Sequence, residues 1–484
     1  MEEGTAEYPA RSLGGSAVVV EECAGVSISE AGACVVNEFK AEERDSDSPE
    51  IIFVAAVKRK NNIATARGGK VNVRRRRGGR GGHHSTAGIG VACVTSTDER
   101  VKKKRAKRRF WEHPSLAMRS ESGIFQAMYE DLRQHPEKFF DFYGMSISTF
   151  DELLSSVKIA ITKKDTVARM AITAEERLSV TLRYLIHGIN FSFLGKDFMI
   201  GRSTISGIVR ETCAAILKAL QPKEMPEPTT EDWTRISEEF YHKTSFPNCL
   251  GAVDGRQVKI VSSQAVIVAS KKFKNCNSVV VMGVADANYK FTAVEVGLFS
   301  GDEGGEFSIE KSSFGSSLLA KSLAIPLPCP PPNSERALPF VFIGREDFPP
   351  HENILQPYAG KDLKVKCSIF NNRLARAYSS IDCALAILCH KFKLLRVGLT
   401  VAPEFGMSIV KTICILHNFL GERDGLNMDD SFACSLEDYA LFRSEVEVIA
   451  EDSKSRREEF ADYFVSPAGE VSWQTHGVEK HEQP

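Results

Sequence analysis

The sequence predicts an α/β domain that follows a helical domain and a disordered tail. From Asn248 to Leu420, apolar runs of strand length alternate with stretches of helical periodicity, which favours the α/β class. From Phe110 to Leu220 the apolar residues recur at helical spacing alone. The residues before Phe110 are rich in Gly, Ser and charge and show no sustained period, which is typical of disorder. The predicted parts are a tail at 1–109, a helical domain at 110–225, the α/β domain at 226–420 and an acidic, partly ordered tail at 421–484.

The N-terminal tail is acidic in residues 1–50 and basic in its later part. The 484 residues are 43% apolar and 26% charged with a net charge of −1, as in ordinary globular chains. Two basic runs, Arg74–His84 and Val101–Arg109, nevertheless lie close together. Structurally such runs are solvated tail, but they also attract phosphate and serve as nuclear import signals. We therefore expect a nuclear protein that binds DNA.

Composition also excludes several classes of protein. No run approaches the ~18 apolar residues of a membrane span, so no membrane partner is expected. The N-terminus lacks a positive region followed by an apolar core, which predicts no signal peptide. The 12 cysteines include no CxxC pair. We expect them to be reduced, small apolar residues, with a zinc site as the sharper alternative.

The helical domain has clear start and stop signals. SISTFDELLSSV begins a helix at Ser146. In a second helix Thr173 is a predicted N-cap, with Glu176 three residues later, and Gly188 ends the helix.

A third helical pattern, MIGRSTISGIVRETCAAILKAL, resembles a helix-turn-helix. Ser203 is the expected cap of a helix whose inward face holds Ile205, Ile208, Val209 and Cys213. In this interpretation the exposed residues would face DNA. The alternative is an ordinary helix pair in a bundle. The candidate DNA-binding residues are Arg202, Ser203, Thr204 and Arg210.

The α/β segment begins with FPNCLGAVDGRQVKI, an apolar run that brings Asp254 to a glycine. An Asp-Gly pair alone more often makes a turn. Three further apolar runs follow, and then a helical pattern around Ile381–Leu395 that carries Asp382. Strands followed by a carboxylate-bearing helix bring distant acids together around a divalent metal. The three runs are Val279–Asn288, Phe291–Leu298 and Phe340–Gly344.

Nine segments in order resemble the nucleases derived from PIF/Harbinger-type transposases, which have a DDE catalytic domain. The resemblance implies a ribonuclease-H-like mixed sheet flanked by helices. It also implies DNA as the substrate, Mg²⁺ or Mn²⁺ as the cofactor of an active enzyme, and a Myb-like DNA-binding partner protein. The segments are RRFWEHP, GIFQAMYEDLRQHPEKFFDFYGMS, LRYLIHGINFSFL, IGRSTISGIVRET, FPNCLGAVDG, VADANYKFTAVEVG, FVFIGREDFPP, IFNNRLARA and ILHNFL.

The resemblance places the first catalytic acid on Asp254 and the third on Asp382, where the family has a helical Glu. The second position falls on Arg345, after FVFIG. A fixed cation ~4 Å from these carboxylates would pair with one of them and compete with the metal. Asp347 is the expected substitute, since it would point the same way as Arg345 in an extended backbone; Glu346 is a weaker one.

Two function classes follow from this pattern. The first is a metal-dependent DNA nuclease, impaired in this copy by Arg345, in which Asp254, Asp382 and Asp347 are the catalytic and metal-binding residues. The second is a domesticated, catalytically inactive nuclear module that binds DNA or protein.

Three other segments have simpler interpretations. His417-Asn418 is expected to make hydrogen bonds at a helix end, with a catalytic pair as the alternative. Asp286 is expected in the turn between the second and third strands. The proline-rich stretch Leu323–Pro339 is expected to be a surface connection.

Overall fold

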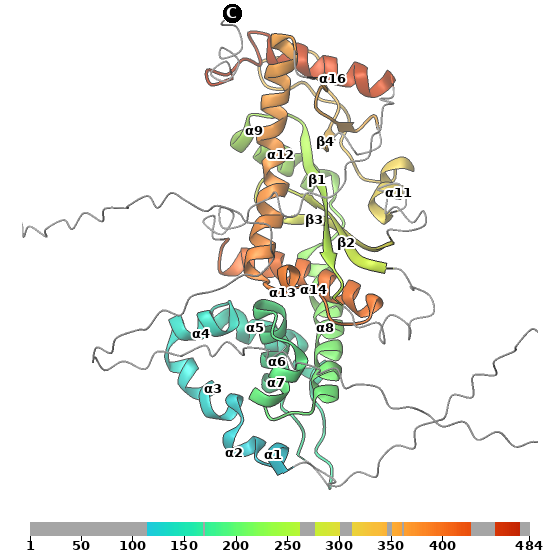
Figure 1. Ribbon diagram of the computed structural model, residues 1–484. Coiled ribbons are helices and arrows are strands. Elements are labelled where there is room, and N and C mark those ends of the chain that lie inside the picture. Colours follow the sequence, from blue (N-terminus) through green and yellow to red (C-terminus); the bar gives the residue numbers. More distant parts are fainter. Residues whose placement is uncertain are drawn as a thin grey trace, which may run out of the picture. The chain divides into compact units, whose positions relative to one another are not determined.

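The computed structural model describes residues 114–167, 170–261, 276–300, 312–345, 351–360, 363–426 and 451–474 (Figure 1). All of them belong to one compact unit, Lys102–Pro484. The predicted N-terminal tail with its two basic runs lies outside the described residues, and so do Glu346 and Asp347. No helix among the described residues is both long enough and apolar enough to cross a membrane.

The first part of the described chain is helical, as predicted. Ser146 caps the N-terminus of α5 by accepting a hydrogen bond from the Thr149 amide. Thr173 caps α6 in the same way, and Gly188 ends α6 with a φ of 67°, where a side chain would be strained. The helices are α1 (Pro114–Ala117), α2 (Arg119–Ser122), α3 (Ile124–Gln134), α4 (Pro136–Tyr143), α5 (Ile147–Ile161), α6 (Ala174–His187) and α7 (Phe191–Asp197).

The longest helix of this part is α8 (Arg202–Glu224), which packs against α5, α6 and α7. The predicted cap at Ser203 is wrong, because the N-cap is Gly201 and Ser203 already lies in the first turn. The extended backbone of Gly201 starts the helix without a side-chain hydrogen bond. The predicted inward face is confirmed: Ile205, Ile208, Val209 and Cys213 are all buried.

A five-stranded mixed sheet forms the second part. Its order is β3-β2-β1-β4-β5. The first three strands are antiparallel, and β4 and β5 join the other side of β1 in parallel. The predicted mixed sheet is therefore confirmed, with one strand beyond its expected end at Gly344. The strands are β1 (Cys249–Lys259), β2 (Cys276–Ala285), β3 (Phe291–Ser300), β4 (Val341–Ile343) and β5 (Ile354–Leu355).

The central strand β1 is buried on both faces along most of its length, as a near-continuous apolar run requires. In register, Asp254 lies opposite Gly283 of β2. A Cβ on Gly283 would lie 2.8 Å from the Phe291 ring and 3.6 Å from the Cδ1 of Ile381 on the next major helix. The glycine thus makes room for the Phe291 ring, while Ile381 would stay at an ordinary van der Waals distance.

Long helices cover the sheet. α12 (Val365–Lys391) packs against β1, β2 and β4, and α9 (Thr230–Thr244) packs against β1. α14 (Pro403–Arg423) contacts β2 and β3 on one side and α8 on the other, so it joins the sheet to the helical part. The short helices α11 (Ser313–Leu319) and α13 (Leu394–Val397) complete this part. The proline-rich stretch connects α11 to β4 mostly at the surface, as expected.

The C-terminal segment also packs on the sheet domain. α16 (Glu451–Phe464) contacts α12 and β5. Arg373 of α12 is almost fully buried and donates hydrogen bonds to the Gly469 carbonyl and the Gln474 side chain. Part of the expected C-terminal tail is therefore ordered against α12.

Candidate active site

Asp254 lies on the central strand with only 5% of its surface exposed. Its Oδ1 accepts a hydrogen bond from the Gly255 amide at 2.7 Å. Its Oδ2 is buried and has no hydrogen-bond partner among the described residues. A buried carboxylate oxygen without a hydrogen bond is costly unless a cation lies nearby, so the neighbouring charges matter.

The nearest cation is Arg256, two residues along β1 and only 4% exposed. Its Nη2 lies 3.6 Å from Asp254 Oδ2 and donates a hydrogen bond of 3.0 Å to Asp382 Oδ1. The two carboxylate oxygens are thus no farther apart than the sum of these distances. The structure brings Asp254 and Asp382 together from β1 and α12, with a guanidinium between them. We call these three residues the acid–guanidinium cluster.

Arg345 also reaches this cluster. It follows β4, and its guanidinium carbon lies 5.6 Å from the centre of the Tyr378 ring on α12. The Tyr378 hydroxyl is buried and interacts with the Asp254 carboxylate. Burial and the charges of Asp254 and Asp382 raise the pKa of Tyr378 well above its usual value, and the Arg345 charge opposes that rise. The phenol therefore stays protonated.

The pKa of Asp382 shows how these charges combine. Burial raises it, repulsion from Asp254 raises it further, and the positive charges of Arg256 and Arg345 oppose the rise. Two carboxylates and two guanidiniums interact here, so their formal charges cancel.

Arg256 is the functional residue that the sequence interpretation missed. Successive side chains of a strand alternate between its faces, so residues 254 and 256 share one face. This alternation along β1 is the signal that places Arg256 beside Asp254. Asp347 lies outside the described residues, so its side-chain direction stays a prediction.

The described residues do not fit a pair of divalent metal ions. Such a site needs several convergent oxygen ligands. Among the residues that the structure describes, no three His, Cys, Asp or Glu side chains converge as a metal site would require. The two acids that do meet already share a guanidinium, and Asp347 lies outside the described residues.

The four candidate DNA-binding residues lie on the first three turns of α8. Arg202, Ser203, Thr204 and Arg210 are all exposed. The guanidinium of Arg210 stacks on the Phe405 ring of α14, 4.1 Å from its centre, so part of its surface is used within the chain. α7, a turn at 198–201 and α8 follow one another as in a helix-turn-helix.

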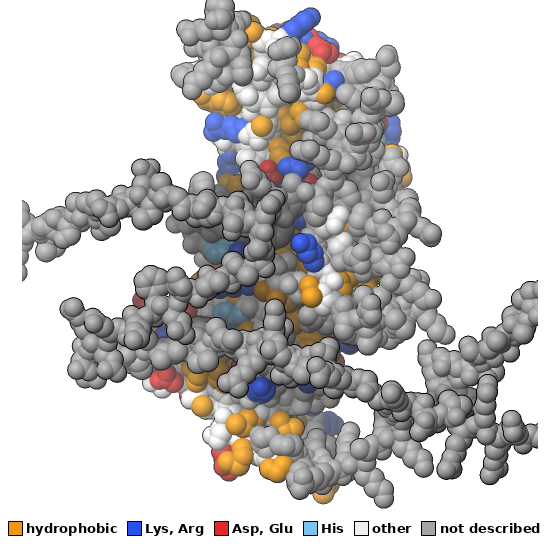
Figure 2. All heavy atoms as spheres, in the orientation of Figure 1, with side chains coloured by type: hydrophobic (Ala, Val, Ile, Leu, Met, Phe, Trp, Pro, Cys, Tyr) orange, Lys and Arg blue, Asp and Glu red, His pale blue; other side chains and the backbone are white. Residues whose placement is uncertain are grey.

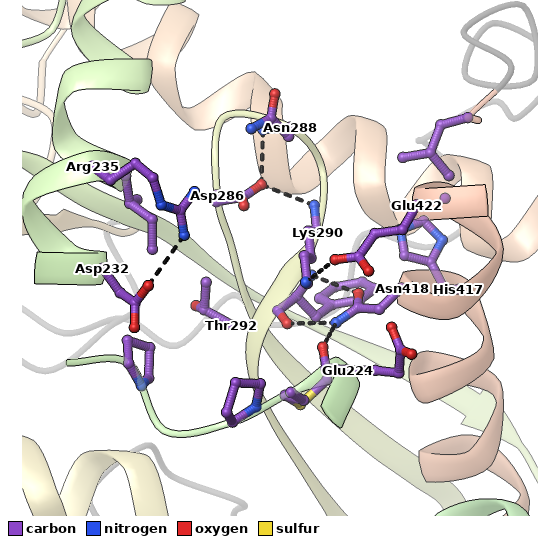
Figure 3. Close-up of a pocket in the computed structure, with 17 residues that line it drawn as sticks. Glu224, Asp232, Arg235, Asp286, Asn288, Lys290, Thr292, His417, Asn418 and Glu422 are labelled. Atoms are coloured by element: carbon purple, nitrogen blue, oxygen red, sulfur yellow. Dashed lines mark hydrogen bonds and ion pairs between the residues drawn. The ribbon is translucent and has the colours of Figure 1, made fainter. Parts of the chain in front are cut away.

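A separate pocket of about 390 Å³ lies between α9, α14 and the β2–β3 turn (Figure 3). None of the acid–guanidinium cluster lines it. Its two cations pair with two of its four acids, Arg235 with Asp232 and Lys290 with Glu422. The other two acids that line it are Glu224 and Asp286.

His417 and Asn418 line this pocket from α14. His417 shares a hydrogen bond of 2.8 Å with the Tyr289 carbonyl, and burial lowers its pKa to about 4. Asn418 bonds both the amide and the carbonyl of Phe291. The hydrogen-bonding role is confirmed, but the helix-end position is wrong, because α14 continues to Arg423.

Asp286 lies in the β2–β3 turn, as predicted. Its Oδ1 accepts hydrogen bonds from the amides of Asn288 and Lys290 at 2.7 and 3.0 Å (Figure 3). Burial raises its pKa to about 6.

The cysteines match the simpler expectation. Among the described cysteines, Cys213, Cys249, Cys389 and Cys414 are buried free thiols. Burial raises the pKa of Cys213 to about 12, so it is an inert apolar group.

Comparison with known proteins identifies the sheet domain. Residues 253–418, which include both acids of the cluster, match the family of DDE superfamily endonucleases. The chain is 25% identical to "Protein ALP1-like" of Arabidopsis thaliana over 345 residues, which cover 68% of this chain and 81% of that protein. No solved structure matches significantly. DDE superfamily endonucleases generally use divalent metals. The predicted resemblance is confirmed over these residues: the sheet domain of this chain is similar to DDE superfamily endonucleases.

Proposed function

We propose that this chain is a transposase-derived protein of the PIF/Harbinger kind that binds DNA in the nucleus and whose metal-dependent DNA cleavage is impaired. The observation that carries this proposal is the acid–guanidinium cluster. Asp254 and Asp382 meet as the acids of a DDE site would, yet Arg256 lies between them. The impairment therefore comes from β1 as well as from Arg345.

The sheet supports a ribonuclease-H-like assignment. An antiparallel meander of three strands continues into two parallel strands beyond β1. Asp254 stands on the central strand, and Asp382 stands on a helix that packs against it. The chemistry of a DDE nuclease needs acids at these two places.

The alternative is a domesticated nuclear module that binds DNA or protein without cleaving. The formal charges of Asp254 and Asp382 are cancelled by those of Arg256 and Arg345. This favours the alternative, because the fold needs no metal to hold the two acids together. DNA is the expected ligand in either case, and a Myb-like partner protein is expected to supply sequence recognition. On the face drawn in Figure 2 the described Lys and Arg side chains that can be seen occur at separate places. The basic runs of the N-terminal tail are expected to supply most of the phosphate attraction, because they are the densest cationic segments of the sequence.

Nicking of supercoiled plasmid in Mg²⁺ or Mn²⁺ tests the proposal. The unmodified chain should nick weakly or not at all. Arg256→Gln combined with Arg345→Asp and Asp382→Glu should raise nicking, and adding Asp254→Asn should abolish it. Robust nicking by the unmodified chain that is lost on Asp347→Asn would contradict the impairment and make Asp347 the working second acid.

A further inference from the structure

The acid–guanidinium cluster is a closed arrangement of charges at the position where a DDE domain binds metal. The Arg256 side chain is as buried as that of Asp254, and both stand on one face of the same strand. Asp382 approaches that face from α12, which packs against β1 and β2. Strand and helix packing together therefore fix the guanidinium between the carboxylates.

The charge of Arg256 is permanent. A lysine in the same place could lose its proton and make room for a metal, but an arginine does not deprotonate in proteins. The backbone of Arg256 lies in the β1–β2 ladder opposite Val281, so a shift of the strand would break the central sheet. The guanidinium can leave the acids only by a change of side-chain conformation within a buried space.

We propose that Arg256 is the resident cation of this site, and that its guanidinium takes the place of the divalent ion between Asp254 and Asp382. This inference rests on the proposed function and adds the residue that excludes the metal. Exclusion of the metal by Arg345 alone would act from the residue after β4. Arg256 instead contacts both acids from β1. The arrangement also implies a latent metal site. The buried Asp254 Oδ2, which has no hydrogen-bond partner among the described residues, and Asp382 Oδ1 would become free ligands once Arg256 loses its charge.

Calorimetric titration of the full chain with MnCl₂ tests the proposal. The unmodified chain and Asp254→Asn should give the same isotherm, because Asp254 is not available to metal. Arg256→Gln should gain one additional Mn²⁺ site, about tenfold or more tighter than the background, since a unit charge a few Å away strongly affects a second cation. Adding Asp254→Asn to Arg256→Gln should remove that site.

Two variants serve as controls. Arg256→Lys leaves a cation that can lose its proton, so it should bind Mn²⁺ more weakly than Arg256→Gln and more tightly as pH rises. Arg376→Gln removes an exposed guanidinium from α12, the helix that carries Asp382, and should gain no site. An equal gain in Arg376→Gln would contradict the proposal, because any loss of positive charge would then suffice.

Two further results would overturn the inference. One is Mn²⁺ binding by the unmodified chain that Asp254→Asn abolishes; this comparison decides the question even when Arg256→Gln does not fold. The other is a folded Arg256→Gln with no additional site. The proposed function can fail separately. Suppose that Arg256→Gln gains the Mn²⁺ site but that Arg256→Gln combined with Arg345→Asp and Asp382→Glu does not nick DNA. Arg256 would then still be the resident cation, but the chain would not be an impaired nuclease.

Discussion

At the scale of single residues, the position of Arg256 on β1 decides what Asp254 and Asp382 can bind. Without Arg256, the carboxylates of Asp254 and Asp382 would repel each other and require a metal. With Arg256, both acids have a cation within 3.6 Å. A one-residue shift along the strand would turn Arg256 to the other face of the sheet. The contact of Arg256 with both acids therefore depends on the two-residue spacing between Asp254 and Arg256.

Asp286 provides a test of burial at the same scale. Its pKa is raised from 3.8 to about 6 in the folded chain. The folded state therefore holds a proton that the unfolded state has lost between these pH values, and stability falls as pH rises through this window. Asp286→Asn keeps the acceptor oxygen for the turn and removes the titration. The measured quantity is the unfolding free energy of Asp286→Asn minus that of the unmodified chain. This difference should be ~3 kcal/mol larger above pH 6 than below pH 4.

Urea unfolding at several pH values measures this difference. His417, whose pKa is lowered to about 4, loses stability in the opposite direction, as pH falls from its usual 6.5. Comparing the two chains cancels this second effect. A difference that does not change with pH would contradict the buried, titrating Asp286.

Some of the site residues could be predicted from the sequence and others could not. Asp254 and Asp382 were predicted because family motifs fix their places in the fold. Arg256 was within reach of the alternation rule. The predicted direction of the Asp347 side chain stays a prediction, because this residue lies outside the described ones.

At the scale of elements, α14 is the helix that holds the two parts together. It packs on β2, β3 and α8. Its buried Asn418 accepts a hydrogen bond from the Phe291 amide and donates to the carbonyls of Phe291 and Glu224. One side chain thus connects three elements.

Asn418→Leu should lower the unfolding free energy by about 2–4 kcal/mol, since it leaves buried backbone groups without partners. Asn372→Leu, at an exposed position of α12, is the matched control and should change it by less than about 0.5 kcal/mol. Urea denaturation measures both. Equal effects would show that Asn418 is not a structural connection.

The exposed start of α8 is the element that we expect to contact DNA. Alanine at Arg202, Ser203 and Thr204 together should weaken binding to a mixed-sequence duplex roughly tenfold, as the loss of an arginine and two hydroxyl contacts would. Lys218→Ala, farther along α8, is the control and should have a smaller effect. Fluorescence anisotropy with the full chain gives both affinities. Unchanged binding by the triple variant would favour the ordinary helix pair.

Local signals predicted element ends where the terminal residue itself decides the end. Thr173 caps α6 with its side chain, and Gly188 ends it with a positive φ, as expected. Gly201 starts α8 through backbone conformation alone, so Ser203 was a misleading signal. The two-residue β5 and the packing of α16 depend on contacts with distant residues, which periodicity does not show.

At the scale of the whole molecule, we propose different functions for the charged tail and the folded unit. We expect the tail to direct the chain to the nucleus and to DNA. Alanine at Lys102–Arg105 and Lys107–Arg109 in a fluorescent fusion should move the protein to the cytoplasm, because the densest cationic run is then lost. Alanine in place of the arginines of Arg74–Arg80 should have a weaker effect. Nuclear accumulation that persists without the first run would refute its role.

Whether the Arg256 guanidinium fills the metal position between Asp254 and Asp382 can be measured directly. The measurement is a crystal structure of the unmodified chain grown with MnCl₂ and examined by anomalous scattering at the manganese edge. Arg256 should remain between the two acids, and no manganese peak should contact either carboxylate. A manganese ion bound by both acids, with the Arg256 side chain turned away, would contradict the proposal.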